Sequence, residues 1–183
     1  MIAGILIIGR QAIFADDSIE PAEWVMYKAG QITLVCYPDI NLKKLEARLR
    51  SRYFYVPMEE RKEFTNPSYE TDKRIMARLW AIFRRTKEIL AMEPRSVNIK
   101  IKVFRNRNEL SDEYSRIFNT SQHYKSFYLH TLGTIYTSMQ DISDSVISHE
   151  MSHVIIDNYF VIIPPPRVAE LLATYVDSHL EKE

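Results

Sequence analysis

The sequence predicts an α+β fold, in which a mixed, mostly antiparallel sheet packs on a long helix and on a second, buried helix. Three observations lead to this prediction. Apolar residues recur every three to four positions over residues 70–92, which indicates a helix with one buried face. Residues 97–104 alternate strictly between apolar and polar, which indicates a strand. Residues 144–160 are apolar on nearly every side of a helix, which indicates a helix inside the protein.

The composition is that of one ordinary globular domain. The chain has 183 residues, of which 46% are hydrophobic, and its formal net charge is zero. A neutral chain gives no overall electrostatic attraction to nucleic acid or to an anionic membrane, so no nucleic-acid partner is expected. The single Cys36 excludes an intramolecular disulfide and is expected to be a small buried hydrophobe.

The first fifteen residues allow two interpretations. The apolar run at residues 2–8 is too short to span a bilayer as a helix, so no transmembrane span is expected. Together with the small residue Ala15 it resembles the apolar region of a secretory signal peptide, although it has no basic start and is interrupted by Arg10. This interpretation predicts a periplasmic or secreted protein. The alternative is an N-terminal strand, which would leave the protein in the cytoplasm.

Residues 16–65 are expected to form an N-terminal hairpin and a basic helix. Two β-prone runs over residues 23–37 flank Ala29 and Gly30, and glycine permits the positive φ of a tight turn. A short helix is predicted over residues 42–53, with its basic side chains on a solvated face, followed by a loop over residues 57–69. The basic residues of that helix are Lys43, Lys44, Arg48, Arg50 and Arg52.

Further elements follow in order toward the C-terminus. A helix is predicted over residues 106–120, and strands over residues 124–130 and 133–138. The buried helix then begins with Asp141 or Ser143 as its N-cap. Three prolines at positions 164–166 turn the chain rigidly, and an amphipathic helix over residues 167–180 follows them.

The buried helix carries the sequence His149-Glu150-Met151-Ser152-His153, which is the H-E-x-x-H pattern of zinc hydrolases. Residues four apart lie on one face of a helix, so both imidazoles can reach one metal ion while Glu150 holds a water beside it. Unpaired buried polar groups cost a few kcal/mol each, and a bound cation would remove that cost. The alternative is a pair of hydrogen-bonded core histidines beside a salt-bridged glutamate.

A third ligand is expected from the last helix, because catalytic zinc usually has three protein ligands. Glu170 lies in the first turn of that helix among apolar residues. His179 and Tyr175 point away from Glu170 by helical phase and are not expected at the metal. The longer H-E-x-x-H-x-x-G-x-x-H pattern fails, because its glycine and last histidine positions hold Ile156 and Tyr159.

The HEMSH motif and the segment Glu170–Tyr175, ELLATY, together resemble the gluzincins, zinc peptidases that have a glutamate ligand on a following helix. The resemblance implies a minimal, single-domain zincin-like catalytic domain over residues 66–183. It also implies one Zn²⁺ per chain, bound by His149, His153 and Glu170, with Glu150 as general base. Some gluzincins have an aspartate where this chain has Thr174. Asp157 and Asp177 are therefore the other candidates for orienting a ligand histidine.

In such enzymes the strand before the motif helix lines the cleft and pairs with the extended substrate. By this resemblance Thr134, Ile135 and Tyr136 are candidates for a substrate-binding edge; the alternative is an interior strand. The residue that stabilises the oxyanion is not identified by the sequence. The candidates for that role are His130, Tyr136, Tyr159 and Arg167.

The expected function is hydrolysis of peptide bonds through a metal-activated water, with a peptide or protein as substrate. A regulatory protein partner is a further expectation, and the N-terminal unit is a candidate for docking it or for covering the cleft. A zinc-stabilised binding or assembly module without catalysis is the main alternative, and a zinc hydrolase for non-peptide bonds is another. The sequence does not give the substrate, its cleavage specificity or the oligomeric state.

Overall fold

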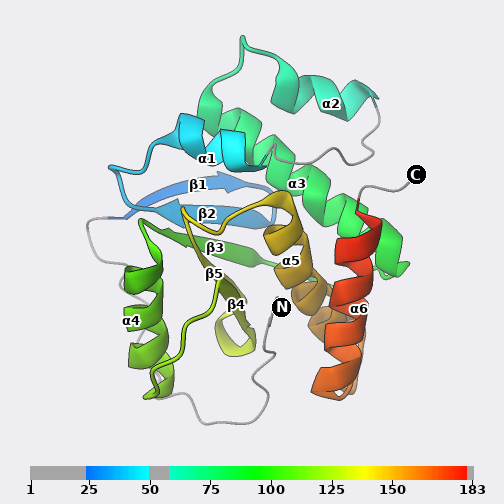
Figure 1. Ribbon diagram of the computed structural model, residues 1–183. Helices are drawn as coiled ribbons and strands as arrows, with labels where there is room; N and C mark the ends of the chain where they lie inside the picture. Colours follow the sequence, from blue (N-terminus) through cyan, green and yellow to red (C-terminus); the bar gives the residue numbers. More distant parts are fainter. Residues whose placement is uncertain (1–23, 50–57, 181–183) are drawn as a thin grey trace.

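The computed structural model describes residues 24–49 and 58–180, and the fold within these residues is α+β. It contains a five-stranded mixed sheet and six α-helices (Figure 1). The predicted signal peptide or first strand over residues 1–15 lies outside the described residues. The strands are β1 (Val25–Ala29), β2 (Ile32–Cys36), β3 (Ile99–Phe104), β4 (Ser126–Leu129) and β5 (Thr134–Ser138).

The sheet has the strand order β1-β2-β3-β5-β4. β1 and β2 are antiparallel, as are β4 and β5, whereas β2 runs parallel to β3 and β3 parallel to β5. The prediction of a mostly antiparallel sheet was therefore wrong, since half of the pairings are parallel. The connections from β2 to β3 and from β3 to β5 pass through helices, which lets each strand return in the same direction.

β5 is an interior strand, because it pairs with β3 on one side and with β4 on the other. Thr134, for example, is opposite Lys100 of β3 and Leu129 of β4. The prediction that Thr134, Ile135 and Tyr136 offer a free edge to a substrate was therefore wrong. Among the described strands the sheet ends at β1 and β4.

The predicted N-terminal hairpin is confirmed, and it belongs to the main sheet. β1 and β2 are joined by a two-residue turn in which Gly30 has a φ of 58°. β2 then pairs along its length with β3, from Ile32 opposite Ile99 to Cys36 opposite Val103. The division of the chain near residue 66 is thus not a boundary in the sheet, and the hairpin forms part of the body that carries β3 and β5.

Five of the six helices lie where the sequence predicts them. They are α1 (Leu42–Leu49), α3 (Thr71–Leu90), α4 (Arg107–Phe118), α5 (Asp144–Tyr159) and α6 (Pro166–His179). The sixth, α2 (Met58–Thr65), replaces the predicted loop over residues 57–69. Its sequence, MEERKEFT, is rich in good helix formers but has no apolar stripe, so periodicity gives no signal for it.

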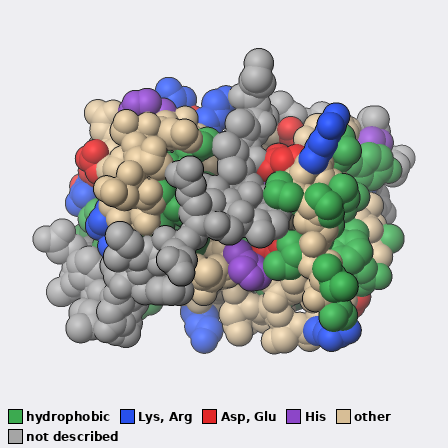
Figure 2. All heavy atoms as spheres, turned by 90° about the horizontal axis from the view of Figure 1, so that it is seen from below, with side chains coloured by type: hydrophobic (Ala, Val, Ile, Leu, Met, Phe, Trp, Pro, Cys, Tyr) green, Lys and Arg blue, Asp and Glu red, His purple; other side chains and the backbone are tan. Residues whose placement is uncertain are grey.

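Apolar side chains are also exposed at one end of the molecule. Figure 2 shows them gathered over the end where α6 lies. Several of them belong to the connection between α5 and α6 and to the outer side of α6. Within the described residues, no helix combines the length and the apolar character needed to cross a membrane.

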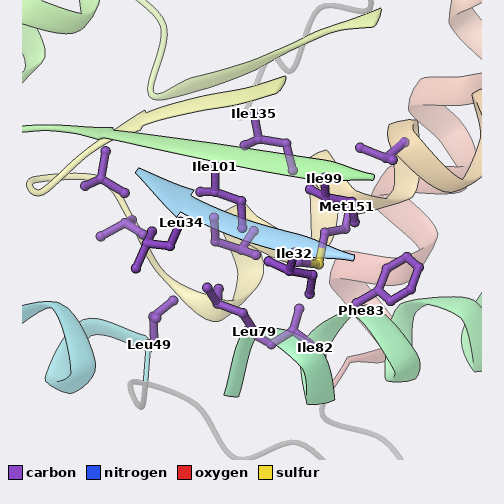
Figure 3. Packing of buried hydrophobic residues seen from close by; sticks show 14 of the residues in the cluster. Ile32, Leu34, Leu49, Leu79, Ile82, Phe83, Ile99, Ile101, Ile135 and Met151 are labelled. Carbon is purple, nitrogen blue, oxygen red and sulfur yellow. The ribbon is translucent and has the colours of Figure 1, made fainter. Parts of the chain in front are cut away.

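The main core lies between one face of the sheet and the helices α1, α3 and α5. Figure 3 shows side chains of β2, β3 and β5, such as Ile32, Ile101 and Ile135, directed at this layer. Leu79 and Ile82 of α3 and Met151 of α5 meet them from the helical side, and each of these side chains is fully buried. Cys36 belongs to this core, as predicted, and burial raises its pKa to about 11.

A second core, made mostly of aromatic residues, lies on the opposite face of the sheet beneath α4. Successive residues of a strand point to opposite faces, so Ile135 of β5 belongs to the main core and Tyr136 to the second core. The rings of Tyr136 and Phe127 stack at a centroid distance of 4.6 Å. Tyr136 therefore faces α4 rather than α5, where the HEMSH motif lies.

Candidate metal centre

α5 is buried from Asp144 to Asp157, which confirms the prediction of a central helix. Its N-terminus is fixed by Ser143, whose side chain accepts a hydrogen bond from the backbone N–H of Val146 at 3.2 Å. Arg78 of α3 donates a 2.7 Å bond to the Asp144 carboxylate in the first turn. The position of α5 against the main core is thus set by a cap and a buried ion pair.

α6 brings the third residue to the two histidines. Pro164, Pro165 and Pro166 separate the helices, and Pro166 begins α6, where its missing N–H costs nothing. The inner side of α6 packs through the buried Ala169, Ala173 and Val176. This packing directs Glu170, on the same side of the helix, toward α5.

The ligand atoms of His149, His153 and Glu170 converge as predicted. The two Nε2 atoms lie 3.4 Å apart. Nε2 of His153 lies 3.3 Å from Oε1 of Glu170, and Nε2 of His149 lies 3.6 Å from Oε2. Nitrogen and oxygen ligands at their usual distance from a tetrahedral Zn²⁺ lie about 3.3–3.4 Å from one another. The three side chains are thus spaced as ligands of one ion.

Unsatisfied polar atoms in the same region support this interpretation. Within the described residues, Oε1 of Glu170, Oε2 of Glu150, Nδ1 of His153 and Oδ1 of Asp157 are buried and have no hydrogen-bond partner. Such atoms are costly unless something compensates for them. A cation between the three ligands satisfies Glu170 directly, and two imidazoles with one carboxylate are a donor set that zinc prefers.

The local charges favour a positive charge at this point. Burial would raise the pKa of Glu170, but the adjacent imidazoles of His149 and His153 lower it to about 2. Burial would lower the pKa of His149, but Glu170 and the nearby Glu150 and Asp177 raise it overall. The carboxylates thus favour the charged form of His149, and they would stabilise a divalent cation in the same way.

Glu150 lies beside this group and is held by a residue that the sequence did not indicate. Ser126 of β4 donates a 2.6 Å hydrogen bond to Oε1 of Glu150, and both side chains are buried. Oε2 has no partner among the described residues. One oxygen of the carboxylate is therefore fixed by Ser126, while the other has no hydrogen-bond partner within the described residues.

The three predicted orienting residues have different environments. Asp157 accepts a 2.6 Å bond from Nδ1 of His130, and burial raises the pKa of its carboxyl despite that partner. Asp177 accepts a bond from Ser145 of α5. Thr174 is exposed on α6. Asp157 thus lies on α5 and Asp177 contacts α5 from α6, whereas Thr174 is exposed.

The structure also separates the predicted oxyanion candidates. Tyr136 is buried in the second core, on the far face of the sheet. Tyr159 and Arg167 are exposed. His130 is the candidate linked to the α5 residues, through Asp157. His179 stacks on Tyr175 at 3.9 Å, and neither residue is part of the metal-ligand group, as helical phase predicted.

No protein-family model, curated protein or solved structure matches the chain.

Proposed function

We propose that the chain is a zinc-dependent peptidase of the minimal gluzincin type, with a zincin-like arrangement of its sheet and helices. The convergence of His149, His153 and Glu170 carries this proposal. Their ligand atoms are at tetrahedral spacing, and Glu150 follows the first histidine directly. When bound, Zn²⁺ would act as a Lewis acid that polarises the scissile carbonyl and lowers the pKa of a water to about 7.

Glu150 is positioned to act as the general base. Ser126 fixes its Oε1, and its Oε2 is free of hydrogen-bond partners among the described residues. A carboxylate in that state can accept a proton from the attacking water and later deliver it to the leaving amine. A buried, half-satisfied carboxylate costs stability, which is typical of a residue kept for function.

The edge strand β4 provides a place for an extended substrate. Ser126, at its first position, contacts Glu150, and His130, directly after its last position, contacts Asp157. Among the described strands, β4 pairs with β5 alone, so the backbone groups on its other side have no described strand to pair with. A peptide that pairs with this edge would lie alongside α5, near the general base.

A zinc-stabilised module without catalysis predicts a different ligand set. Structural zinc sites are closed by four protein ligands, whereas catalytic sites keep one position open. The group found in the described part of the chain has three members. Three protein ligands leave one position of a tetrahedral zinc open, and this favours a hydrolytic site over a structural one.

Two variants with matched controls test the metal and the base separately. Elemental analysis should find about one zinc per chain, lost in His153→Ala but kept in His179→Ala, whose histidine is outside the group. Glu150→Gln should keep zinc yet lose cleavage of unfolded casein, whereas Glu88→Gln, on the exposed side of α3, should keep both. Full zinc content in His153→Ala would refute the ligand assignment. Full activity in Glu150→Gln would refute the base.

A further inference from the structure

A cavity of about 650 Å³ lies beside β1, at the edge of the sheet farthest from β4. It is lined by residues 26–30 of β1 and its turn, by one side of α3 and by Glu63 of α2. We use the name β1 pocket for this cavity. Its described lining contains none of the metal-centre residues, and β2, β3 and β5 separate the two edges of the sheet. Its volume is within the range of ligand-binding sites.

Two residues of β1 direct their backbone groups away from the sheet. Ile99 of β3 donates its N–H to the backbone oxygen of Gln31 at 2.8 Å, which fixes the odd-numbered residues of β2 as those bonded to β3. The even-numbered residues of β2 are therefore bonded to β1, where their partners are again the odd-numbered residues. It follows that the N–H and C=O groups of Met26 and Lys28 point away from β2, and no described strand pairs with them.

This edge of the sheet is accessible. Met26 is 58% exposed, and Lys28 and Ala29 are exposed as well. Figure 1 shows β1 as the outermost strand on the side of the sheet where α3 passes. An exposed edge strand with backbone donors and acceptors directed outward is a template for one further strand.

The α3 wall of the β1 pocket is apolar. Met76, Ala77 and Trp80 recur at helical spacing on one side of α3, and Trp80 is 40% exposed. Tyr27, which lies between the two outward-bonding residues of β1, packs against the main core on the same face of the sheet. The space beside Tyr27 is therefore bounded by a strand edge on one side and by methionine and tryptophan side chains on the other.

The charged residues around the β1 pocket balance one another. Lys28 and Lys73 are basic, whereas Glu63 and Asp72 are acidic. Lys73 also pairs with Glu70 at 3.1 Å. The rim thus gives no net attraction to an anion or a cation, and the apolar α3 wall favours an uncharged apolar group.

We propose that the β1 pocket binds an extended peptide segment of another protein, which adds a strand to β1. The backbone of the segment would bond to Met26 and Lys28, and an apolar side chain would enter the space between Tyr27 and Trp80. Because side chains alternate along a strand, every second residue of the segment would face α3. The expected ligand is therefore an uncharged segment with apolar residues at alternate positions, and its binding does not depend on the proposed peptidase function.

Two other occupants fit the structure less well. The chain enters β1 from Trp24, which stacks on Tyr37 and packs against Phe104 in the second core, on the face of the sheet opposite α3. The residues before Trp24 thus approach from the far side of the sheet. A second copy paired antiparallel through β1 would bring its own α2 and α3 to the same face, where Glu63 of α2 already lines the space beside the edge. A single extended chain needs only about 5 Å beside β1.

The binding test uses a capped, fluorescein-labelled heptapeptide in which threonine alternates with leucine. Fluorescence anisotropy measures its binding to the full, metal-loaded chain, and every protein carries Glu150→Gln so that no peptide is cleaved. This parent protein should bind the peptide. Two further peptides carry N-methyl groups, one on the threonine nitrogens and the other on the leucine nitrogens. Successive N–H groups of a strand point to opposite sides, so only one set can bond to β1, and the two affinities should differ at least about tenfold.

Two pairs of variants test the strand edge and the apolar wall. Met26→Pro removes an outward N–H without removing a bond to β2, and it should weaken binding about tenfold. Met26→Ala loses the same side chain but keeps the N–H, so its loss should be much smaller. Trp80→Ala should also weaken binding about tenfold, because the apolar wall is lost. Its control is Tyr175→Ala on α6, which removes an aromatic side chain that is 49% exposed and should bind like the parent.

Three results would overturn the proposal: a parent protein that binds no peptide, equal affinities for the two N-methylated peptides, or full binding in Trp80→Ala. The comparison of N-methylated peptides uses the parent protein alone, so it stands even if Met26→Pro does not fold. A dimer seen by analytical ultracentrifugation, abolished in Met26→Pro and formed without peptide binding, would assign the edge of β1 to a second copy instead.

Discussion

Ser126 and Glu150 are joined by a 2.6 Å hydrogen bond that connects the edge strand β4 to the helix α5. The serine is the donor, because the carboxylate can only accept. The bond leaves Oε2 of Glu150 without a partner among the described residues. The orientation of the proposed general base is therefore set by a residue on the strand that we expect to bind substrate.

Replacement of Ser126 should affect turnover more than substrate binding. Ser126→Ala is expected to lower kcat about tenfold with little change in KM, because a buried bond to a charged group is worth about 1.5–3 kcal/mol and holds the base in place. Ser126→Thr, which keeps the hydroxyl, should recover most of the activity. Zinc content should stay constant in both variants. Equal loss of activity in Ser126→Thr, or a change confined to KM, would contradict a positioning role.

The convergence of the three candidate metal ligands could be predicted from the sequence because most of their geometry is local. His149 and His153 lie one helical turn apart, so their spacing alone places both on one face of α5. Glu170 follows after a short, proline-fixed connection. Ser126 gave no such signal, because it is 24 positions from Glu150 in the chain and meets it only through the packing of β4 against α5.

The errors have the same physical origin. An edge strand and an interior strand of this length can have the same residue pattern, so the order β1-β2-β3-β5-β4 cannot be obtained from β5 alone. The parallel pairings of β3 likewise depend on crossovers through α3 and α4. α2 was missed because its sequence carries helix propensity without an apolar stripe. The periodicity of a segment shows which of its side chains are buried. It does not show the order of strands in a sheet, the direction in which they pair, or a helix that has no apolar face.

The ion pair between Arg78 and Asp144 should contribute strongly to stability. Both side chains are buried, and Arg78 also donates to the backbone oxygen of Leu49. Asp144→Asn is expected to lower the free energy of unfolding by about 3–5 kcal/mol, because the arginine would keep a buried charge without its counter-ion. Chemical denaturation of the metal-free protein measures this change.

Lys73→Met provides the control for the Asp144 variant. Lys73 pairs with Glu70 on the surface of α3, where both side chains are exposed and water screens the interaction. The free energy of unfolding of the Lys73→Met variant should match that of wild type. An Asp144→Asn variant as stable as wild type would show that the pair does not fix the start of α5.

The two glycines with positive φ should differ in their tolerance of alanine. Gly30 and Gly133 both have a φ of 58°, which costs about 1–2 kcal/mol for a residue with a Cβ. A Cβ on Gly30 would meet no atom within 4 Å, whereas a Cβ on Gly133 would lie 3.1 Å from the backbone oxygen of Asn98. Gly133→Ala should therefore lower the melting temperature more than Gly30→Ala. The reverse order in thermal unfolding would contradict this geometry.

The carboxyl group of Asp141 should make the free energy of unfolding depend on pH. Burial would raise the pKa of its carboxyl, but bonds from Arg107 and Ser138 lower it overall. A lowered pKa in the folded state gives stability that is present above the unfolded value of about 3.9 and is lost as pH falls through the folded value. Arg107→Gln should therefore be less stable than wild type at neutral pH and approach it in acid. Arg116→Gln, which breaks the exposed pair with Glu113, should show no such convergence.

Asp157 should affect the affinity for zinc although it is outside the ligand group. Oδ1 of Asp157 and Nδ1 of His153 are both buried without a partner within the described residues, and they belong to side chains one helical turn apart. A bond between them in the metal-loaded protein would satisfy both atoms and fix the imidazole with Nε2 toward the metal. Asp157→Asn is therefore expected to weaken zinc binding at least about tenfold, as measured by competition with a chromogenic chelator.

His130→Gln should weaken zinc binding less, because His130 acts only by holding the other carboxylate oxygen of Asp157 at 2.6 Å. Unchanged affinity in Asp157→Asn, together with a loss in Asp177→Asn, would assign the orienting role to α6 instead.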